Sequence, residues 1–308
     1  MPELSFAPEF DSAIPYMQRT RSYYLALGYD NPYVWAHYSN VPFTPLKKPL
    51  KASTLALITT AVPYDPSRGD QGPGAPYNAQ AKFYEPYAIP TTIDPDLRIA
   101  HVGIDRKHAN LSEMACWFPL NAARQAVAEQ RIRKLADRFY GLPTNRSQRH
   151  TIENDAPRIL QMCQVDGVDV VVLIPNCPIC HQSISLLARF LEEAGISTII
   201  IGAAKDIVEY CGVPRFVFND FPLGNAVARP QDPQSQQIIF DLALDVLEFA
   251  PGPRTTVQSA LRWSEDPRWK LDYMNIERLS KQEIETLRSE AEAARLAAKE
   301  IRQKTVGR

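Results

Sequence analysis

The sequence predicts an α/β fold in which a doubly wound, mostly parallel sheet carries helices on both faces. Between residues 168 and 218, short apolar runs alternate with longer segments of helical character. Gly195 and Gly212 follow two of these segments, where a glycine commonly ends a helix. Strands that alternate with helices pair in parallel through right-handed crossovers, so both faces of the sheet are covered. The predicted fold adds an irregular N-terminal segment, rich in proline and aromatic residues, and a long C-terminal helix.

The first 50 residues combine tyrosines and prolines without a sustained helical or strand period. We expect them to wrap around the core rather than to form it. Residues 54–62 are apolar and rich in β-forming residues, which predicts a buried first strand that ends at Pro63. A second strand is expected at 97–102, and residues 120–140 show the apolar spacing of a helix.

A regular alternation follows a helix predicted over 152–163. Its strands are expected at 168–174, 197–201 and 215–218, and its helices at 178–194, 204–211 and 235–249. In the last segment, Ile284, Leu287 and further apolar residues recur in steps of three and four among charged residues, which predicts an amphipathic helix over 280–303. This helix either packs on the core, lies exposed, or joins copies of the chain in a homo-oligomer.

The chain is long enough for one large core with additions at both ends. We divide it into an N-terminal wrapping segment at 1–50, an α/β core at 51–255 and a C-terminal extension at 256–308. The 34 basic and 35 acidic residues nearly balance, and no long run has a single sign of charge. A nucleic-acid partner is therefore not expected, whereas small molecules and proteins are.

The sequence indicates a cytoplasmic protein without membrane contact. No apolar run approaches the ~18 residues of a membrane span, and the N-terminus lacks the basic and then apolar order of a secretory signal. Five cysteines are too few for a disulfide scaffold and are compatible with a reducing compartment.

The motif Cys177-Pro178-Ile179-Cys180-His181 directly follows a predicted strand and begins a predicted helix. The partial positive charge at a helix N-terminus lowers the pKa of a thiol, so we expect Cys177 at the N-cap to be the nucleophile. Cys180, one turn later, would resolve an adduct by forming a disulfide. His181 would stabilise the thiolate or transfer a proton, or it is simply a capping or surface histidine.

Two other interpretations of the cysteine pair compete with redox chemistry. A closed zinc site needs about four ligands, and the sequence contains no second Cys-x-x-Cys and no His-x(3–5)-His. His101, His108 and Cys116 would complete such a site only if the fold brought them together, so no metal site is predicted. The remaining alternative is a pair of inert buried thiols.

His101 and Asp105 follow the second predicted strand and are expected at the same edge of the sheet as Cys177. There they would orient the substrate or steer protons, although a core histidine and a turn aspartate are the simpler interpretation. Thr59 and Thr60 end the first predicted strand and would donate hydrogen bonds to a substrate carboxylate. Ordinary β propensity also explains these two threonines.

Taken in order, these motifs resemble the selenoprotein B family of glycine, sarcosine, betaine and D-proline reductases, most closely the D-proline reductase type. The resemblance extends over about residues 50–250, and the chain has cysteine in place of selenocysteine. The matching pieces are Leu57–Val62, Gly69–Asp70, Arg98–His101 with Asp105, Trp117–Leu120, Ile132–Gly141, Val168–His181, Glu192–Ile196 and Phe221–Gly224.

The resemblance implies a reductase subunit in which a selenolate or thiolate attacks the carbon next to a carbonyl group and cleaves a C–N bond. A neighbouring thiol then regenerates the nucleophile, and a partner subunit can bear a pyruvoyl group. No cofactor is identified on this chain itself, because no pyruvoyl-forming serine is recognisable in it.

The leading hypothesis is a thiol-dependent oxidoreductase that acts on a small carboxylate or amino-acid-like molecule, together with a partner subunit or a thiol reductant. In it Cys177 attacks and Cys180 resolves, while His181, His101 and Asp105 steer protons. A non-redox racemase or lyase is disfavoured, because residues three apart on a helix do not easily face opposite sides of one carbon. A non-catalytic binding or complex subunit is the remaining alternative.

Overall fold

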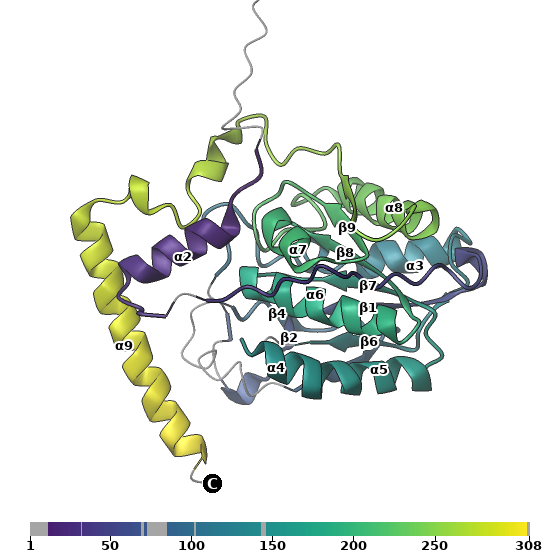
Figure 1. Ribbon diagram of the computed structural model, residues 1–308, viewed down its shortest axis with the longest axis horizontal. Helices are drawn as coiled ribbons and strands as arrows, with labels where there is room; N and C mark the ends of the chain where they lie inside the picture. Colours follow the sequence, from purple (N-terminus) through teal and green to yellow (C-terminus); the bar gives the residue numbers. More distant parts are fainter. Residues whose placement is uncertain are drawn as a thin grey trace, which may run out of the picture.

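The computed structural model describes residues 12–31, 33–68, 71–72, 85–101, 103–142 and 146–306. The central sheet has eight strands in the order β10-β9-β8-β7-β1-β6-β3, with β5 also paired to β1 (Figure 1). The strands are β1 Thr54–Thr59, β3 Tyr87–Pro90, β5 Lys134–Leu135, β6 Arg138–Gly141, β7 Val170–Ile174, β8 Ser197–Gly202, β9 Arg215–Phe218 and β10 Thr255–Gln258. β3 runs antiparallel to β6, and the other strand pairs described in this sheet are parallel. The predicted fold class is confirmed.

Helices cover both faces of this sheet. Those described are α2 Tyr16–Ala26, α3 Leu120–Ala128, α4 Gln148–His150, α5 Ala156–Val165, α6 Pro178–Glu193, α7 Lys205–Cys211, α8 Pro233–Phe249 and α9 Lys281–Val306, with a π-helical turn at Thr151–Asp155. One buried cluster joins α3 and α8 to the sheet, and a second joins α5, α6 and α7 to its opposite face.

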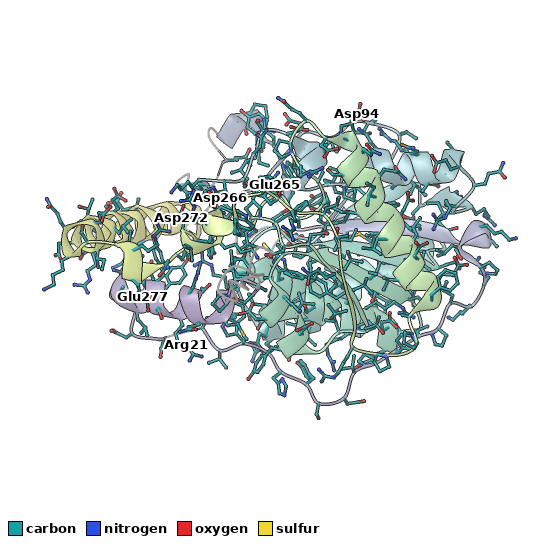
Figure 2. The ribbon with its side chains drawn as sticks, turned by 90° about the horizontal axis from the view of Figure 1, so that it is seen from above. Arg21, Asp94, Glu265, Asp266, Asp272 and Glu277 are labelled. Carbon is teal, nitrogen blue, oxygen red and sulfur yellow. The ribbon has the colours of Figure 1, made fainter. Side chains whose placement is uncertain are left out.

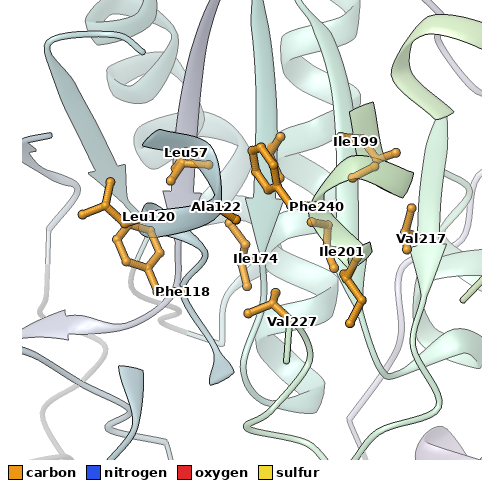
Figure 3. Packing of buried hydrophobic residues seen from close by; sticks show 14 of the residues in the cluster. Leu57, Phe118, Leu120, Ala122, Ile174, Ile199, Ile201, Val217, Val227 and Phe240 are labelled. Carbon is orange, nitrogen blue, oxygen red and sulfur yellow. The ribbon is translucent and has the colours of Figure 1, made fainter. Parts of the chain in front are cut away.

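Alternating residues of each central strand enter the two clusters. Leu57 and Ile201 face α3 and α8 (Figure 3), whereas Ile58 and Ile200 face the opposite helices. Successive strand residues point to opposite faces, so a strand buried on both sides must be apolar throughout. This requirement explains why β1, β7 and β8 are recognisable in the sequence as continuous apolar runs.

Two predicted elements are wrong. The expected strand at 97–102 is only β4, Leu97–Arg98, which pairs antiparallel with β2, Val62–Pro63, in a separate two-stranded sheet. Val102 lies outside the described residues. The expected helix over 120–140 ends at Ala128, and the residues beyond form β5 and β6.

The helix α3 ends early because Gln130 adopts a left-handed conformation, with φ 59°. The backbone N–H of Arg131 then donates back to the carbonyl of Ala126 at 2.9 Å, which closes the helix. Phe139 and Tyr140 are both fully buried in β6, one in each cluster. A short helix followed by a strand that is buried on both faces thus gave the same apolar spacing as one long helix.

The N-terminal segment contains α2, which the sequence did not predict. The division of the chain at residues 50 and 255 stays a prediction, and β10 begins at the second boundary and continues beyond it. Gly69 and Asp70, which belong to the family resemblance, lie outside the described residues.

The helix predicted over 280–303 is confirmed as α9, Lys281–Val306, which lies beside α2 at one end of the molecule (Figures 1 and 2). Arg288 Nε donates to the carbonyl of Ala26 at 2.7 Å, and the Arg295 guanidinium lies 4.6 Å from the Tyr29 ring centre. Among the described residues, no helix combines the length and the apolar character needed to cross a bilayer.

A buried ion pair attaches the N-terminal segment to the core. Arg215 Nη1 on β9 lies 2.8 Å from Glu192 Oε1 at the end of α6, and the two side chains are 1% and 0% exposed. Thr198 N and Oγ1 donate to the same carboxylate oxygen at 2.6 and 2.9 Å. Arg215 Nη2 donates to the carbonyl of Thr44 at 2.9 Å, and its guanidinium lies 4.0 Å from the Phe43 ring centre. One arginine thereby joins α6, β9 and the wrapping segment.

We predict that Arg215→Met lowers the free energy of unfolding by about 3–5 kcal/mol, because it leaves the Glu192 carboxylate buried without its cation. The matched control is Arg131→Met, which removes a partly exposed pair with Asp245 at 2.7 Å and should cost about 1 kcal/mol or less. Urea unfolding followed by circular dichroism measures both. Equal losses in the two variants would contradict a structural role for the buried pair.

Candidate active site

The Cys-x-x-Cys motif lies at the C-terminal edge of the sheet, between β1 and β7. β1 pairs with β6 on one side and with β7 on the other, so the order of strands reverses at this point. Parallel α/β sheets bind ligands at such a reversal, beyond the carboxyl ends of the strands. Thr60 directly follows β1 and Asn176 follows β7, and the Thr60 hydroxyl accepts a hydrogen bond from the Asn176 backbone N–H at 3.1 Å.

Cys177 is the N-cap of α6, as the sequence predicts. Its backbone is extended, and Pro178 is the first helical residue. The Cys177 sulfur accepts a hydrogen bond from the backbone N–H of Cys180 at 3.2 Å. The helix therefore uses a sulfur atom where a serine or aspartate oxygen is more usual.

Three side chains from two distant segments meet at this edge. The sulfurs of Cys177 and Cys180 and a ring nitrogen of His101 all lie within 4.8 Å of one another. Cys180 Sγ is 3.3 Å from His101 Nδ1, and it also forms a hydrogen bond with Thr60. His101 arrives from the loop after β4 rather than from a strand of the main sheet.

The sequence led us to expect Cys177 to be the more acidic of the two thiols, but their surroundings favour ionisation of Cys180. Burial, followed by the interaction with Cys180, raises the pKa of the Cys177 thiol well above its usual range. Burial also opposes a charge on Cys180, but a hydrogen bond from Cys177, the attraction of His101 and hydrogen bonds from His101 and Thr60 hold its pKa well below the usual range. Of the two thiols, ionisation is therefore favoured at Cys180, with Cys177 as its hydrogen-bond donor.

A cavity of about 150 Å³ opens beside this cluster. Its walls come from α2 and the loop after it, from the loop after β4, from Arg146 before α4, from the turn into α6, and from Met274 between β10 and α9. Cys177 and His101 line the cavity, whereas Cys180 lies behind them and is fully buried. A ligand in the cavity therefore contacts Cys177 and His101 rather than Cys180.

His181 does not act on the thiols as expected. Its Nε2 accepts hydrogen bonds from the backbone N–H groups of Ala203 and Ala204 at 3.0 and 3.2 Å, so its Nδ1–H donates to the Cys177 carbonyl at 2.8 Å. Burial lowers the pKa of His181 to about 4, and the ring is neutral. A Cβ atom on Gly202 would lie 2.8 Å from Nε2, so this contact requires glycine at the end of β8. His181 ties the start of α6 to β8 and has no free nitrogen for proton transfer.

Asp105 and the two threonines also differ from their expected roles. Asp105 Oδ1 accepts the backbone N–H groups of Lys107 and His108, both at 3.2 Å, as a turn aspartate does, and Asp105 does not line the cavity. Thr59 is fully buried, and its hydroxyl accepts the backbone N–H of Ala61 at 3.1 Å. Thr60 is equally buried and positions Cys180. Neither threonine is placed to bind a substrate carboxylate.

The cluster of His101, Cys177 and Cys180 can offer three ligand atoms to a thiophilic ion such as zinc. A closed structural zinc site needs a fourth ligand. Within the described part of the chain, no other histidine, cysteine or carboxylate joins this group, and His108 and Cys116 lie outside it.

Most residues of the cavity wall were missed by sequence reasoning. They are Thr20, Arg21, Tyr24, Tyr29, Asn31, Tyr33, Trp35, Gly103, Arg146, Pro178, Ile179 and Met274. The density of aromatic residues in the first 50 positions was a usable signal, but it indicated wrapping rather than a ligand site. The two arginines belong to no motif.

Comparison with known proteins finds relatives in reductase complexes. The chain is 30% identical to D-proline reductase subunit gamma of Acetoanaerobium sticklandii over 216 residues, 68% of this chain and 84% of that protein. It is 27% identical to glycine reductase complex component B subunit gamma of Carboxydothermus hydrogenoformans over 203 residues, 63% of this chain but only 45% of that protein. No family model and no solved structure matches the chain.

We predict that His181 makes the stability of the protein depend on pH. Its pKa is lower in the folded state than the ordinary 6.5, so the unfolded chain binds the additional proton and stability falls as the pH decreases from 6.5 toward 4. The loss attributable to His181 is about 3 kcal/mol. His181→Gln should be less stable at pH 8, because it loses hydrogen bonds, and should have a flatter profile between pH 6.5 and 4. Urea titrations across this range measure the difference, and parallel profiles would contradict a neutral buried imidazole.

Proposed function

Because the chain belongs to the family of D-proline reductase subunit gamma and glycine reductase component B subunit gamma, we propose that it is a thiol-dependent reductase. Its substrate would be a small carboxylate or an amino-acid-like molecule. One observation carries the proposal: Cys177 and His101 line a cavity, and Cys180 lies behind them with its sulfur within 4.8 Å of their ligand atoms. A nucleophile, a resolving thiol that also accepts the nucleophile's proton, and a histidine that stabilises the resolving thiolate are thereby assembled at one edge of the sheet.

In the first step Cys177 attacks the substrate carbon that bears an amine leaving group, next to the carboxylate. The Cys177 proton passes to the Cys180 thiolate as the S–C bond forms and the C–N bond breaks. The leaving amine keeps the electron pair of the broken bond and takes up the proton that Cys180 received from Cys177. Cys180 acts here as the general base, and its hydrogen bond with Cys177 supplies the path for the proton.

In the second step Cys180 attacks the sulfur of Cys177. Its proton has passed to the leaving amine, so Cys180 is again a thiolate that accepts a hydrogen bond from His101 Nδ1 at 3.3 Å, and an S–S bond forms as the S–C bond breaks. The released carbon takes the electron pair and a proton. The substrate gains two electrons and the cysteine pair becomes a disulfide, which an external dithiol reduces in the next cycle.

The geometry favours this sequence over a two-base racemase. Cys180 is fully buried behind Cys177, so the two sulfurs cannot flank a substrate carbon from opposite sides. Thr60 and His181 act as positioning residues, since Thr60 contacts Cys180 and His181 holds the backbone carbonyl of Cys177.

We predict that Cys177→Ser abolishes reductive C–N cleavage of D-proline, by about three orders of magnitude or more, with dithiothreitol as the reductant and the chain supplied with its partner subunit. Mild oxidation of the wild type should form a reversible Cys177–Cys180 disulfide, detected by peptide mass spectrometry. Cys163→Ala is the matched control, because Cys163 is a buried core thiol that does not line the cavity. An active Cys177→Ser protein would remove the nucleophile, and failure of the disulfide to form would instead favour a non-catalytic complex subunit.

We also propose that the chain works with a partner reductase subunit, since both relatives are named as subunits. A pyruvoyl group, where one is used, would be carried by that partner. The long helix α9 supplies a surface for assembly, and Leu296 on it is 59% exposed.

For the chain alone we expect a homodimer in light scattering coupled to size exclusion, with about twice the 34.7 kDa of one chain. Replacement of the half-buried Ile284 and Leu287 by glutamate should then shift the mass to that of the monomer. A wild-type monomer would contradict self-association through this helix.

A further inference from the structure

Two arginines stand at the cavity beside Cys177. Arg21 lies on α2 (Figure 2), and Arg146 lies just before α4. Both are exposed, and neither forms a hydrogen bond or ion pair with another residue in the described part of the chain. The positive charge of Arg146 acts on the Cys177 sulfur and favours its ionised form. The arginines therefore place uncompensated positive charge at the cavity.

The cavity also contains buried polar atoms that lack partners. Thr20 Oγ1 and His101 Nε2 have no hydrogen-bond partner among the described residues, and the two side chains are only 4% and 6% exposed. Both residues line the cavity. Buried polar atoms are nearly always hydrogen-bonded, so these two indicate a ligand with polar atoms.

The rest of the wall is aromatic and apolar. Tyr33 and Trp35 meet edge to face with ring centres 4.9 Å apart, and Tyr24 and Tyr29 do so at 5.2 Å. Ile179 and Met274 complete this surface. A cavity near 150 Å³ has the size that holds a six-membered hydrocarbon ring in other proteins. The shape and composition thus suit a compact apolar group rather than a small polar molecule such as glycine.

We propose that the substrate is a carboxylate with an apolar, ring-sized body, whose carboxylate pairs with Arg146 and Arg21 while the tyrosines and Trp35 enclose the body. The inference rests on the proposed function in using the same cavity, and it specifies the substrate class. Arginine matches a carboxylate with two parallel hydrogen bonds, which the buried Thr59 and Thr60 cannot supply. The carboxylate and the body together would hold the adjoining carbon near Cys177.

The test is a binding measurement with three matched probes: phenylacetate, phenylacetamide and acetate. Phenylacetamide removes the charge of phenylacetate and keeps its shape, and acetate keeps the charge without the ring. Isothermal titration calorimetry of the wild type should show phenylacetate binding about 10- to 100-fold more tightly than phenylacetamide, with acetate weaker still. Equal affinities of phenylacetate and phenylacetamide would overturn the role of the arginines, and equal affinities of phenylacetate and acetate would overturn the role of the aromatic wall.

Two substitutions test whether Arg146 causes the preference for the charged probe. Arg146→Gln should remove most of the preference for phenylacetate over phenylacetamide, whereas Arg146→Lys should restore part of it. The control Arg149→Gln changes an exposed arginine on α4 that pairs with Glu153 at 3.4 Å and does not line the cavity, and it should keep the full preference. A preference that survives in the double variant Arg21→Gln, Arg146→Gln would reject the proposal.

Failure of this inference is distinguishable from failure of the thiol mechanism. Phenylacetate has no amine to release, so its binding does not depend on redox turnover. A protein that forms the Cys177–Cys180 disulfide but shows no preference for phenylacetate rejects only the substrate class. A protein that prefers phenylacetate but forms no disulfide rejects only the redox step.

Discussion

The parallel pairing of β1 with β7 is the constraint on which the candidate site depends. It brings Thr60 beside Asn176, which is 116 positions away in the sequence, and it sets the start of α6 against the end of β1. Cys177 is the N-cap of α6 and Cys180 lies in its first turn, where its sulfur contacts the Thr60 hydroxyl. Because strand order reverses here, the adjoining loops diverge and leave space for a ligand.

Burial then decides how charge is distributed at this edge. A helix N-terminus alone would favour a thiolate at Cys177, but desolvation opposes any charge at a buried sulfur. The charge is therefore stable only where several partners compensate it, and Cys180 has those partners in Cys177, His101 and Thr60. The same desolvation keeps His181 neutral. Its ring therefore joins the start of α6 to the end of β8 through hydrogen bonds and does not add a second positive charge.

The additions at both ends of the chain turn this edge into an enclosed site. The segment that carries α2 contributes four of the cavity's aromatic side chains, and Met274 belongs to the C-terminal extension. The buried pair of Arg215 with Glu192 anchors that first segment, since Arg215 also holds the carbonyl of Thr44. The ion pair thus fixes the segment at Thr44, nine residues after Trp35 of the cavity wall.

The parallel core and the place of Cys177 at the N-cap of α6 could both be predicted from the sequence. The signals are local: β1, β7 and β8 are continuous apolar runs, and a proline follows the N-cap of α6. Such signals favour the same backbone conformation whatever the distant contacts of the segment. The apolar spacing that suggested one helix over 120–140 failed because a short helix and a buried strand can share that spacing. The three-dimensional contacts were needed to show that His101 reaches Cys180 and favours its ionisation, that Asp105 closes a turn, and that Arg21 and Arg146 share one cavity. These outcomes depend on desolvation and on contacts between residues far apart in the chain, for which a local pattern contains no information.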